Sequence, residues 1–446
     1  MPVSPARAAA FDILLRIERQ SSYASELLHS SAHANLSSTD HALTTELVMG
    51  VLRWRSRLDD EISTASSQSL TKLDSEVLVT LRLALYQIRW LDRIPQRAAV
   101  HESVELVKRA RKGSAAPFVN AVLRKLTTKL AGDEANKHRD SPQSLSRAYA
   151  HPLWLVERWT DAYGLTIAKQ ICARNQTIPN TVVRLRTANA EAELAASGIT
   201  LHAGAILSSA RKIESGDITH TELFRRGEIL IQDEASQLVS TLVGTGKRIL
   251  DCCAAPGGKT LVIADHNLDA TLVAIELHPH RARLLSKLLQ RSKPDARVHV
   301  VAADAQRLPF DISFDRVLAD VPCSGTGTLA RNPEIKWRLT PNDLPALQSR
   351  QKAILRSALA RLGTGGRLVY STCSLEKEEN EDVVRQVLAD EAAFHLLDCH
   401  VELDRLKAAG QLSWPDPASL AAGPFLRTIP GVHPCDGFFA AMVEKK

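Results

Sequence analysis

Cysteine is scarce in this sequence, and the few cysteines form no structural pattern. Seven occur among 446 residues, and no two of them have the C-x-x-C spacing. An odd number without regular spacing argues against a disulfide framework, and the missing pairs argue against structural zinc. We therefore expect free thiols and no metal centre.

Long apolar runs are missing as well. No stretch approaches the roughly 20 apolar residues that a membrane-spanning helix needs. The opening stretch MPVSPARAAAFDILLRIERQ is interrupted by Asp12 and Arg16 and does not have the form of a secretory signal. The sequence thus predicts a cytoplasmic protein without a membrane partner.

The positive charge is concentrated in one part of the chain. Residues 1–150 hold 21 lysines and arginines against 16 aspartates and glutamates, a net charge of +5 out of +6 for the whole chain. Such asymmetry fits binding to a nucleic acid, although a solvated helical surface explains it nearly as well. The stretch KRARKG, residues 108–113, is a candidate for phosphate contacts.

Four stretches differ in residue pattern. Residues 1–132 show helical periodicity, which predicts an all-α domain. Residues 133–147 are polar, which predicts a linker. Residues 148–235 mix both patterns, as in a small α/β region. From 236 to 446 strand candidates alternate with helix candidates, which predicts a doubly wound, parallel α/β sheet.

The expected elements follow from the same periodicities. The predicted helices are 5–20, 75–91, 98–111, 116–130, 152–164, 279–292 and 344–362. The predicted strands of the C-terminal sheet are 248–253, 271–276, 297–304, 315–320 and 366–372.

A glycine turn, ILDCCAAPGGKT (249–260), joins the first of these strands to a helix. In such sheets ligands bind beyond the carboxyl ends of the strands, and Gly257 and Gly258 allow close approach to the backbone. Cys253 stands where a Walker A loop needs glycine, and the Rossmann G-x-G-x-x-G is missing. Taken alone, a purely structural turn explains the stretch equally well.

Acidic residues end the strands beside this turn. Glu276, Asp304 and Asp320 close three strands, and Asp251 precedes the turn itself. A helix cap or a solvated charge explains any one of them. Together they would line one rim of the sheet, where carboxylates can accept hydrogen bonds from ribose hydroxyls and from an adenine amine. The rim suits a nucleoside-bearing cofactor without a phosphate tail.

Two cysteines lie in turn-like, polar surroundings, Cys323 in DVPCSGTGTL and Cys373 in VYSTCSLEKEEN. Buried structural cysteines usually have apolar neighbours. With the glycine turn, these motifs resemble the RsmB/Sun (Fmu) family of bacterial 16S rRNA cytosine-5 methyltransferases in order and spacing, over about residues 223–385. The helical N-terminal part resembles the NusB-type RNA-binding domain of that family. Cys252 departs from the family, which has a bulky apolar residue there, and is expected to point into the core.

The resemblance implies a fold, a cofactor and a site. A NusB-like domain, a small α/β region and a Rossmann-like methyltransferase domain would bind S-adenosyl-L-methionine. Glu276 would bind the ribose, Asp304 would lie beside the adenine, and Asp320 would lie between cofactor and target base. Asp251 would support the loop, and Lys259 has an alternative explanation as a surface charge at a helix start. The cofactor loop would consist of Cys253, Ala254, Ala255, Pro256, Gly257, Gly258 and Lys259.

Methylation at C5 of cytosine needs a nucleophile that first adds to C6, because C5 alone is not nucleophilic enough. A thiolate suits this step, since it adds readily and can leave again. By resemblance Cys373 is this nucleophile, and Cys323 assists release of the product. Asp320 is the candidate acid that protonates N3, which requires a raised pKa in a dry pocket. The target base must be unstacked from the RNA.

The expected partner is small-subunit ribosomal RNA, bound by a monomer. Arg331, Lys336 and Arg338 are candidates for phosphate contacts, with a solvated loop as an equal alternative, and Trp337 is expected to pack beneath that loop. Three other functions stay open: the same chemistry on tRNA, methylation of DNA cytosine, and a non-catalytic RNA-binding or assembly factor. The intact motifs argue against the last. Only about 120 residues follow Cys323, too few for the target-recognition domain of a DNA methyltransferase.

Overall fold

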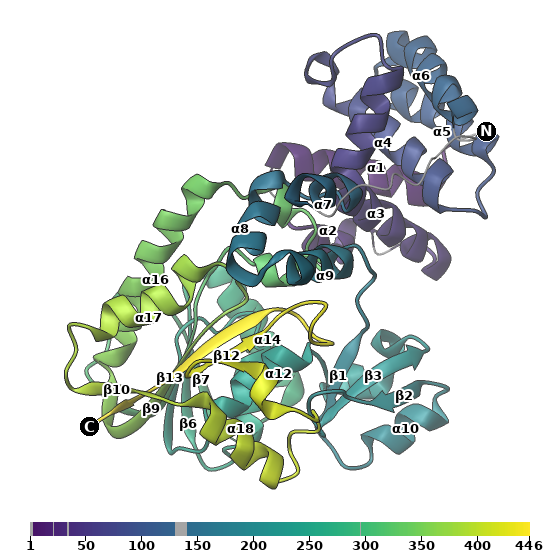
Figure 1. Ribbon diagram of the computed structural model, residues 1–446. Helices are drawn as coiled ribbons and strands as arrows, with labels where there is room; N and C mark the ends of the chain where they lie inside the picture. Colours follow the sequence, from purple (N-terminus) through teal and green to yellow (C-terminus); the bar gives the residue numbers. More distant parts are fainter. Residues whose placement is uncertain (1–2, 21, 34, 130–140, 295) are drawn as a thin grey trace. The chain divides into compact units, whose positions relative to one another are not determined.

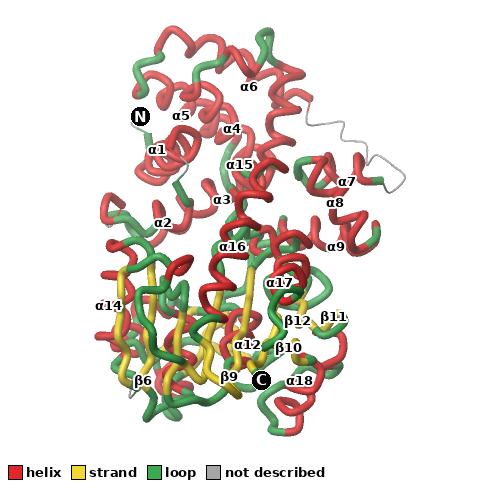
Figure 2. Tube along the Cα trace, turned by 90° about the vertical axis from the view of Figure 1, so that its left-hand side faces the viewer, coloured by secondary structure: helices red, strands yellow, loops and turns green. Residues whose placement is uncertain are grey.

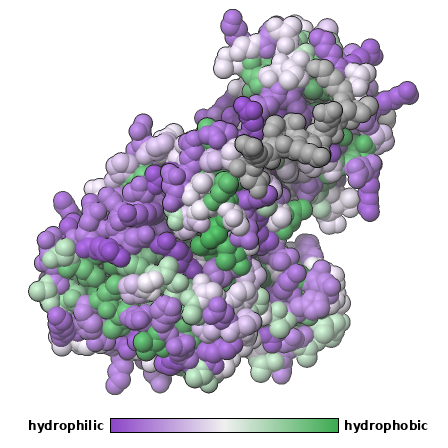
Figure 3. Space-filling model, viewed as in Figure 1, coloured by the Kyte–Doolittle hydropathy of each residue, from purple (hydrophilic) through white to green (hydrophobic). Residues whose placement is uncertain are grey.

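The computed structural model describes residues 3–20, 22–33, 35–129, 141–294 and 296–446. The chain divides into two units, shown in Figure 1: Met1–Ile178 with Leu329–Arg338, and Pro179–Thr328 with Leu339–Lys446. In the described ranges, no helix has both the length and the apolar character that crossing a bilayer requires. On the face that Figure 3 shows, hydrophilic residues cover most of the surface, and apolar residues form smaller patches.

The first unit is helical, and its core gathers the apolar stripes of its helices. Leu14 of α1, Leu47 of α3, Leu81 of α4 and Leu123 of α6 belong to one buried cluster. The predicted helices are confirmed as α1, α4, α5, α6 and α8, whereas α3 was not among them. The helices are α1 (Pro5–Gln20), α2 (Ala24–Leu28), α3 (Ser38–Ala65), α4 (Ser75–Trp90), α5 (Gln96–Arg109), α6 (Ala116–Lys129), α7 (Pro142–Ala148), α8 (Leu153–Tyr163), α9 (Leu165–Asn175) and α15 (Ile335–Arg338).

The predicted linker is described only in part. Its residues 133–140 lie outside the described residues, and α7 begins at Pro142 with a capping box formed by Ser141 and Ser144. The domain boundaries at 132 and 235 stay predictions.

A small antiparallel sheet opens the second unit. Its strand order is β2-β3-β1-β4, and Leu194 and Leu223 pack with Val183 in its buried cluster. These elements are β1 (Val182–Leu185), α10 (Ala190–Ala196), β2 (Thr200–Ala203), β3 (Ala210–Ser215), α11 (Glu222–Arg226) and β4 (Ile229–Ile231).

The large sheet of this unit has the order β11-β12-β13-β9-β8-β5-β6-β7, with β10 paired to β13, and Figure 2 shows its strands side by side. From β9 to β7 all pairs are parallel, which confirms the doubly wound core. The antiparallel edge of β10 to β13 was not predicted, because no strand was expected after residue 372. The strands are β5 (Arg248–Asp251), β6 (Thr271–Glu276), β7 (Arg297–Ala302), β8 (Phe314–Asp320), β9 (Leu362–Thr372), β10 (Phe394–Leu397), β11 (Ala421–Ala422), β12 (Phe425–Thr428) and β13 (Phe438–Lys445).

Helices cover both faces of this sheet. Successive residues of a strand point to opposite faces, so Ile249 packs in one buried cluster with Leu238 and Leu285. Its neighbour Leu250 packs in the other cluster, with Leu355. Because β5 lies between β8 and β6, the strand order reverses there, and ligands of such sheets bind at the carboxyl end of that strand. The helices are α12 (Glu234–Leu242), α13 (Gly258–Asp265), α14 (Pro279–Ser292), α16 (Leu344–Leu359), α17 (Glu381–Leu388) and α18 (Cys399–Ala408).

Candidate active site

The glycine turn joins β5 to α13 at this reversal point. Gly257 has a φ of +110°, a region that favours glycine, and a Cβ there would lie 2.6 Å from Leu285 of α14. The backbone conformation therefore favours glycine at this position, and its missing side chain makes room for α14. The buried Asp251 accepts the Thr260 hydroxyl at 2.7 Å through Oδ2, and its Oδ1 has no partner among the described residues. Burial raises the pKa of Asp251 to about 7.

Two predicted cofactor ligands follow the next strands. Glu276 ends β6 almost buried, accepts the His278 N–H at 2.9 Å and lies 3.8 Å from the Arg281 guanidinium. Asp304 follows β7, is exposed and accepts the Gln306 N–H at 2.9 Å. Asp304 thus caps a short 3-10 helix, which is the structural role that the sequence analysis gave as the alternative for any one of these acidic residues. Glu276, by contrast, is held at a buried strand end.

Lys259 and Asp320 form an ion pair across the turn. The Lys259 Nζ lies 2.8 Å from Asp320 Oδ2, and the Ser371 hydroxyl donates to Oδ1 at 2.7 Å. The same ammonium lies 5.0 Å from the centre of the Phe438 ring. Burial acts to lower the pKa of Lys259, but Asp320, with a contribution from Cys373, holds it above its ordinary value. Lys259 is therefore a charged member of the site and not an exposed surface charge.

The environment predicted for Asp320 is absent from the site. Protonation of this carboxyl needs a pocket that disfavours its charge, but the Lys259 ammonium and the Ser371 hydroxyl both stabilise the ionised form. Sequence patterns miss these two partners because they come from α13 and β9.

The structure brings the two cysteines together. Their Sγ atoms are 3.1 Å apart, and the Cys373 N–H donates to Cys323 Sγ at 3.3 Å. Cys323 follows β8 and Cys373 follows β9, and these strands pair in parallel, so their carboxyl ends meet at one edge. The hydrogen bond with Cys373, together with burial, raises the pKa of the Cys323 thiol well above its ordinary value. Cys323 is therefore held as a thiol beside Cys373.

A glycine lets the Cys323 loop approach so closely. Gly327 donates its N–H to the Cys373 carbonyl at 2.9 Å, and its own carbonyl accepts the Gly437 N–H at 2.8 Å. A Cβ at Gly327 would collide with the carbonyl oxygen of Gly437. Any other residue at 327 would push the two cysteine loops apart.

Glu379 connects both cysteine loops and was missed by the sequence analysis. Its buried carboxylate accepts the Ser324 N–H at 2.8 Å, the Gln351 amide at 2.8 Å and the Ser374 hydroxyl at 2.5 Å. Ser324 and Ser374 each follow one of the two cysteines in the chain. Glu379 lies in the acidic run EKEEN, where nothing in the pattern separates it from its neighbours, although its position six residues after Cys373 was the available signal.

The segment after the Cys323 loop contacts the helical unit, not solvent. Lys336 is 1% exposed and donates to the carbonyl oxygens of Arg53 and Ala150 at 2.9 and 2.7 Å. The predicted phosphate contact of Lys336 is therefore wrong. Trp337 and Arg338 also donate to main-chain carbonyl oxygens of that unit, so Trp337 packs beneath the segment as expected.

The other cysteines of the chain are free, and Cys252 lies in the core. Cys252 is buried in the sheet core, as predicted from its departure from the family pattern. All seven cysteines are free. In the part of the chain that the structure describes, no group of three or more histidines, cysteines, aspartates or glutamates could hold a metal ion.

Comparison with known families and proteins matches both units. Residues 243–444 match the model for the 16S rRNA methyltransferase RsmB/F, and residues 4–128 match the NusB family. The probable ribosomal RNA small subunit methyltransferase B of Bacillus subtilis is 32% identical over 464 residues and covers both chains completely. The chain belongs to the RsmB/F family of 16S rRNA methyltransferases. The ribosomal RNA small subunit methyltransferase B of Vibrio cholerae is also 32% identical, over 93% of this chain and 92% of its own.

Solved structures share the fold. The crystal structure of PH0851 has a TM-score of 0.80 at 24% identity and covers the whole of both chains. A methyltransferase homologue from Pyrococcus horikoshii has a TM-score of 0.57 at 26% identity, over 69% of this chain and all of its own. The predicted NusB-like and Rossmann-like folds are confirmed.

The site fits the cofactor of this family, S-adenosylmethionine. Next to the glycine turn lies a buried carboxyl oxygen, Asp251 Oδ1, that has no hydrogen-bond partner among the described residues. The carboxylate of Glu276 stands at the neighbouring strand end. Carboxyl oxygens in these positions can accept hydrogen bonds from the hydroxyl groups of a ribose.

Proposed function

We propose that this protein methylates C5 of a cytidine in 16S rRNA through a covalent bond between Cys373 and C6. The observation that carries the proposal is the distance of 3.1 Å between the two thiols. Addition to C6 needs only one cysteine, so the second one is available for a further step, the release of the product. A thiolate needs electropositive help at neutral pH, and the Lys259 ammonium interacts electrostatically with Cys373.

We assign the cofactor contacts to the rim and turn. Residues 253–259 would surround S-adenosylmethionine, Glu276 would accept from the ribose hydroxyls, and Asp304 would lie beside the adenine. When bound, the cofactor supplies an electrophilic methyl group. Glu276→Ala should weaken cofactor binding by about 1.5–3 kcal/mol, the range for hydrogen bonds to charged groups. Calorimetry that finds wild-type affinity would remove Glu276 from the site.

The cysteines would divide the work as follows. The Cys373 thiolate forms a bond to C6, and electron density moves to C5, which takes the methyl group. The C5 proton then passes to water, the C5–C6 double bond re-forms, and Cys373 departs as a thiolate. Cys323, held as a thiol, donates its S–H to the departing sulfur and so assists release.

Asp320 would hold the target base as a carboxylate. An ionised carboxylate can accept a hydrogen bond from the N4 amine of cytosine, which uracil lacks. Its ion pair with Lys259 holds the acceptor in position. Asp320→Asn should therefore lower methyl transfer more than cofactor affinity, and an equal loss of both would make Asp320 a cofactor ligand only.

The two cysteine variants test the mechanism. Cys373→Ala should abolish methyl transfer and form no covalent complex. Cys323→Ala should still add and methylate, but fail to release, and so accumulate a protein–RNA adduct that survives denaturing electrophoresis. A stable adduct from Cys373→Ala would reverse the assignment, and a slow Cys323→Ala enzyme without adduct would leave Cys323 a packing residue.

The substrate is tested in cells. Mapping of 5-methylcytosine in RNA from cells with and without this gene should reveal a site in 16S rRNA that depends on it. If the only 5-methylcytosine that depends on this gene is in tRNA, the substrate is tRNA and the proposed chemistry is unchanged. We further propose a cytoplasmic monomer, which fractionation and sedimentation would test.

A further inference from the structure

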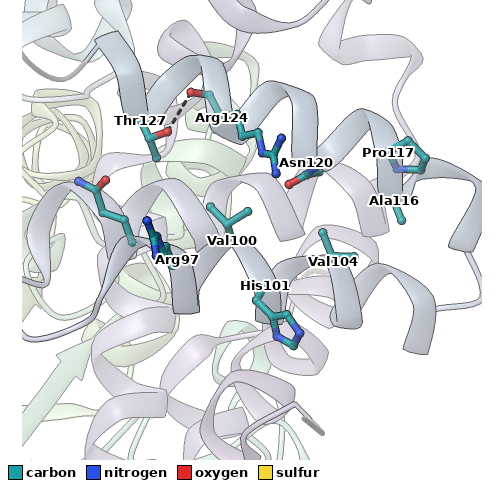
Figure 4. Close-up of a pocket in the computed structure, with 10 residues that line it drawn as sticks. Arg97, Val100, His101, Val104, Ala116, Pro117, Asn120, Arg124 and Thr127 are labelled. Carbon is teal, nitrogen blue, oxygen red and sulfur yellow. Dashed lines mark hydrogen bonds between the residues drawn. The ribbon is translucent and has the colours of Figure 1, made fainter.

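A groove runs between α5 and α6 of the helical unit. It encloses about 940 Å³ and is lined by residues one or two turns apart along each helix. Figure 4 shows Arg124 and Asn120 reaching from α6 toward α5, and Val100 and Val104 pointing from α5 into the space between the helices. Pro117 lies at one end of the groove.

The groove is positively charged and has no acidic residue in its lining. Arg97 comes from α5 and Arg124 from α6, and both are exposed. Within the described ranges, neither guanidinium has an ion pair or a hydrogen bond. Some other arginines of this unit are paired; Arg82, for example, lies 2.6 Å from both Glu18 and Asp59. An arginine left unpaired beside an apolar floor is available to an external anion.

The basic patch that the sequence favoured is different. Lys108, Arg109 and Lys112 lie 2.7, 2.9 and 2.9 Å from carboxylates of the same unit. Those carboxylates belong to Glu105, Asp12 and Asp74. Their charges are neutralised locally, so a phosphate would have to compete with them.

We propose that the α5–α6 groove binds a few unpaired nucleotides of the RNA substrate. Arg97 and Arg124 would contact phosphates, Val100 and Val104 would carry a base on their apolar surface, and Asn120 would meet a base edge. The volume of the groove lies in the range of small-ligand sites, which suits a few nucleotides. The inference rests on the proposed function only in taking RNA as the substrate.

The test uses the full chain and two double variants. Binding of a fluorescein-labelled, unstructured 12-nucleotide RNA is followed by anisotropy at several salt concentrations. Arg97→Ala with Arg124→Ala should weaken binding about tenfold and make the slope of log affinity against log salt shallower by about 1.4, two contacts at about 0.7 each for single strands. Lys108→Ala with Arg109→Ala removes the same charge from paired positions and should change affinity less than about twofold.

Crosslinking gives a second measurement. 4-Thiouridine in the same RNA should crosslink to peptides of α5 and α6 in the wild type, and a matched duplex should crosslink far less. Equal weakening in both double variants, wild-type binding in the groove variant, or crosslinks confined to other helices would each overturn the proposal. So would a groove variant that binds RNA normally but loses contact with a protein of the small subunit.

Methyl transfer separates this inference from the proposed function. If the wild type methylates cytidine while the groove variant binds RNA normally, only the groove assignment fails. If the groove variant loses binding as expected but the wild type forms no 5-methylcytosine, only the chemistry fails.

Discussion

Lys259 lies in the second unit, called the methyltransferase unit below, and Lys336 lies in the helical unit. Both side chains lie largely away from solvent, and both belong to motifs of the family. Lys259 has a carboxylate partner, Asp320, which holds its pKa above the ordinary value. Lys336 donates only to carbonyl oxygens in the hydrogen bonds above, and burial, with the charge of Arg53, holds its pKa well below the ordinary value. The surroundings of the lysine in one unit therefore favour its positive charge, whereas burial in the other unit disfavours it.

The difference predicts that Lys259 acts through its charge, whereas Lys336 contributes to packing. An opposite charge offsets the desolvation of a buried ammonium, whereas burial without such a partner lowers its pKa. Lys259 lies beside the carboxylate of Asp320, whereas Lys336 joins Leu329–Arg338 to helices of its own unit. Matched substitutions at both positions can test the contrast.

The largest effect is expected from Lys259→Met. It removes the positive charge that interacts with Cys373 and leaves Asp320 without its partner, so methyl transfer should fall about 10²–10³-fold, as when a preorganised donor is lost from an active site. Single-turnover transfer from labelled S-adenosylmethionine measures it. Lys336→Met is the matched control, and its rate per folded molecule should stay within about twofold of wild type. Equal losses of methyl transfer in the two variants would show that the charge of Lys259 has no special role.

Lys336→Ala should mainly affect stability. It leaves a cavity and two buried carbonyl oxygens without a donor, which should lower the unfolding free energy of the helical unit by about 2–4 kcal/mol. Lys336→Met fills the space but not the hydrogen bonds and should cost less. Denaturant titration followed by circular dichroism measures both variants. A wild-type midpoint for Lys336→Ala would show that the buried contacts contribute nothing.

The pH dependence of stability should have opposite signs at the two lysines. The folded chain binds fewer protons at Lys336 than the unfolded chain, so wild type should gain stability relative to Lys336→Met as pH rises toward about 10.4, by about 1.4 kcal/mol per unit above the folded pKa. The contribution of Lys259, whose folded pKa is raised, is present below about 10.4 and is lost above it. Unfolding measured from pH 7 to 11 tests both, and a flat difference for Lys336→Met would contradict its lowered pKa.

The smallest effect is expected from Lys112, a half-buried lysine at the surface of the helical unit. Lys112 lies 2.9 Å from Asp74, but solvent screens such a pair and the side chains lose freedom in forming it. Lys112→Met should leave the unfolding midpoint unchanged. A clear shift in a thermal melt would show that surface pairs stabilise this unit as buried ones do.

Much of the site could be predicted from the sequence alone. The strand–turn–helix alternation placed Asp251, Glu276 and Asp320 at strand ends, because the carboxyl ends of parallel strands share one edge. The predicted helix 279–292 coincides with α14 in both bounds, since its apolar stripe and its N-terminal proline are local signals. The loop motifs identified the family, which the comparisons confirmed.

The sequence by itself determined the helical and α/β units, the glycine turn and the two cysteines of interest, because these depend on local periodicity and on motif residues. Only the tertiary structure decided that Cys323 and Cys373 lie 3.1 Å apart, that Glu379 joins their loops, and that Asp320 is paired. It also decided which lysine has a carboxylate partner. Those properties depend on partners from other strands and helices, and burial and pairing set the protonation of a side chain that its own sequence neighbours do not reveal.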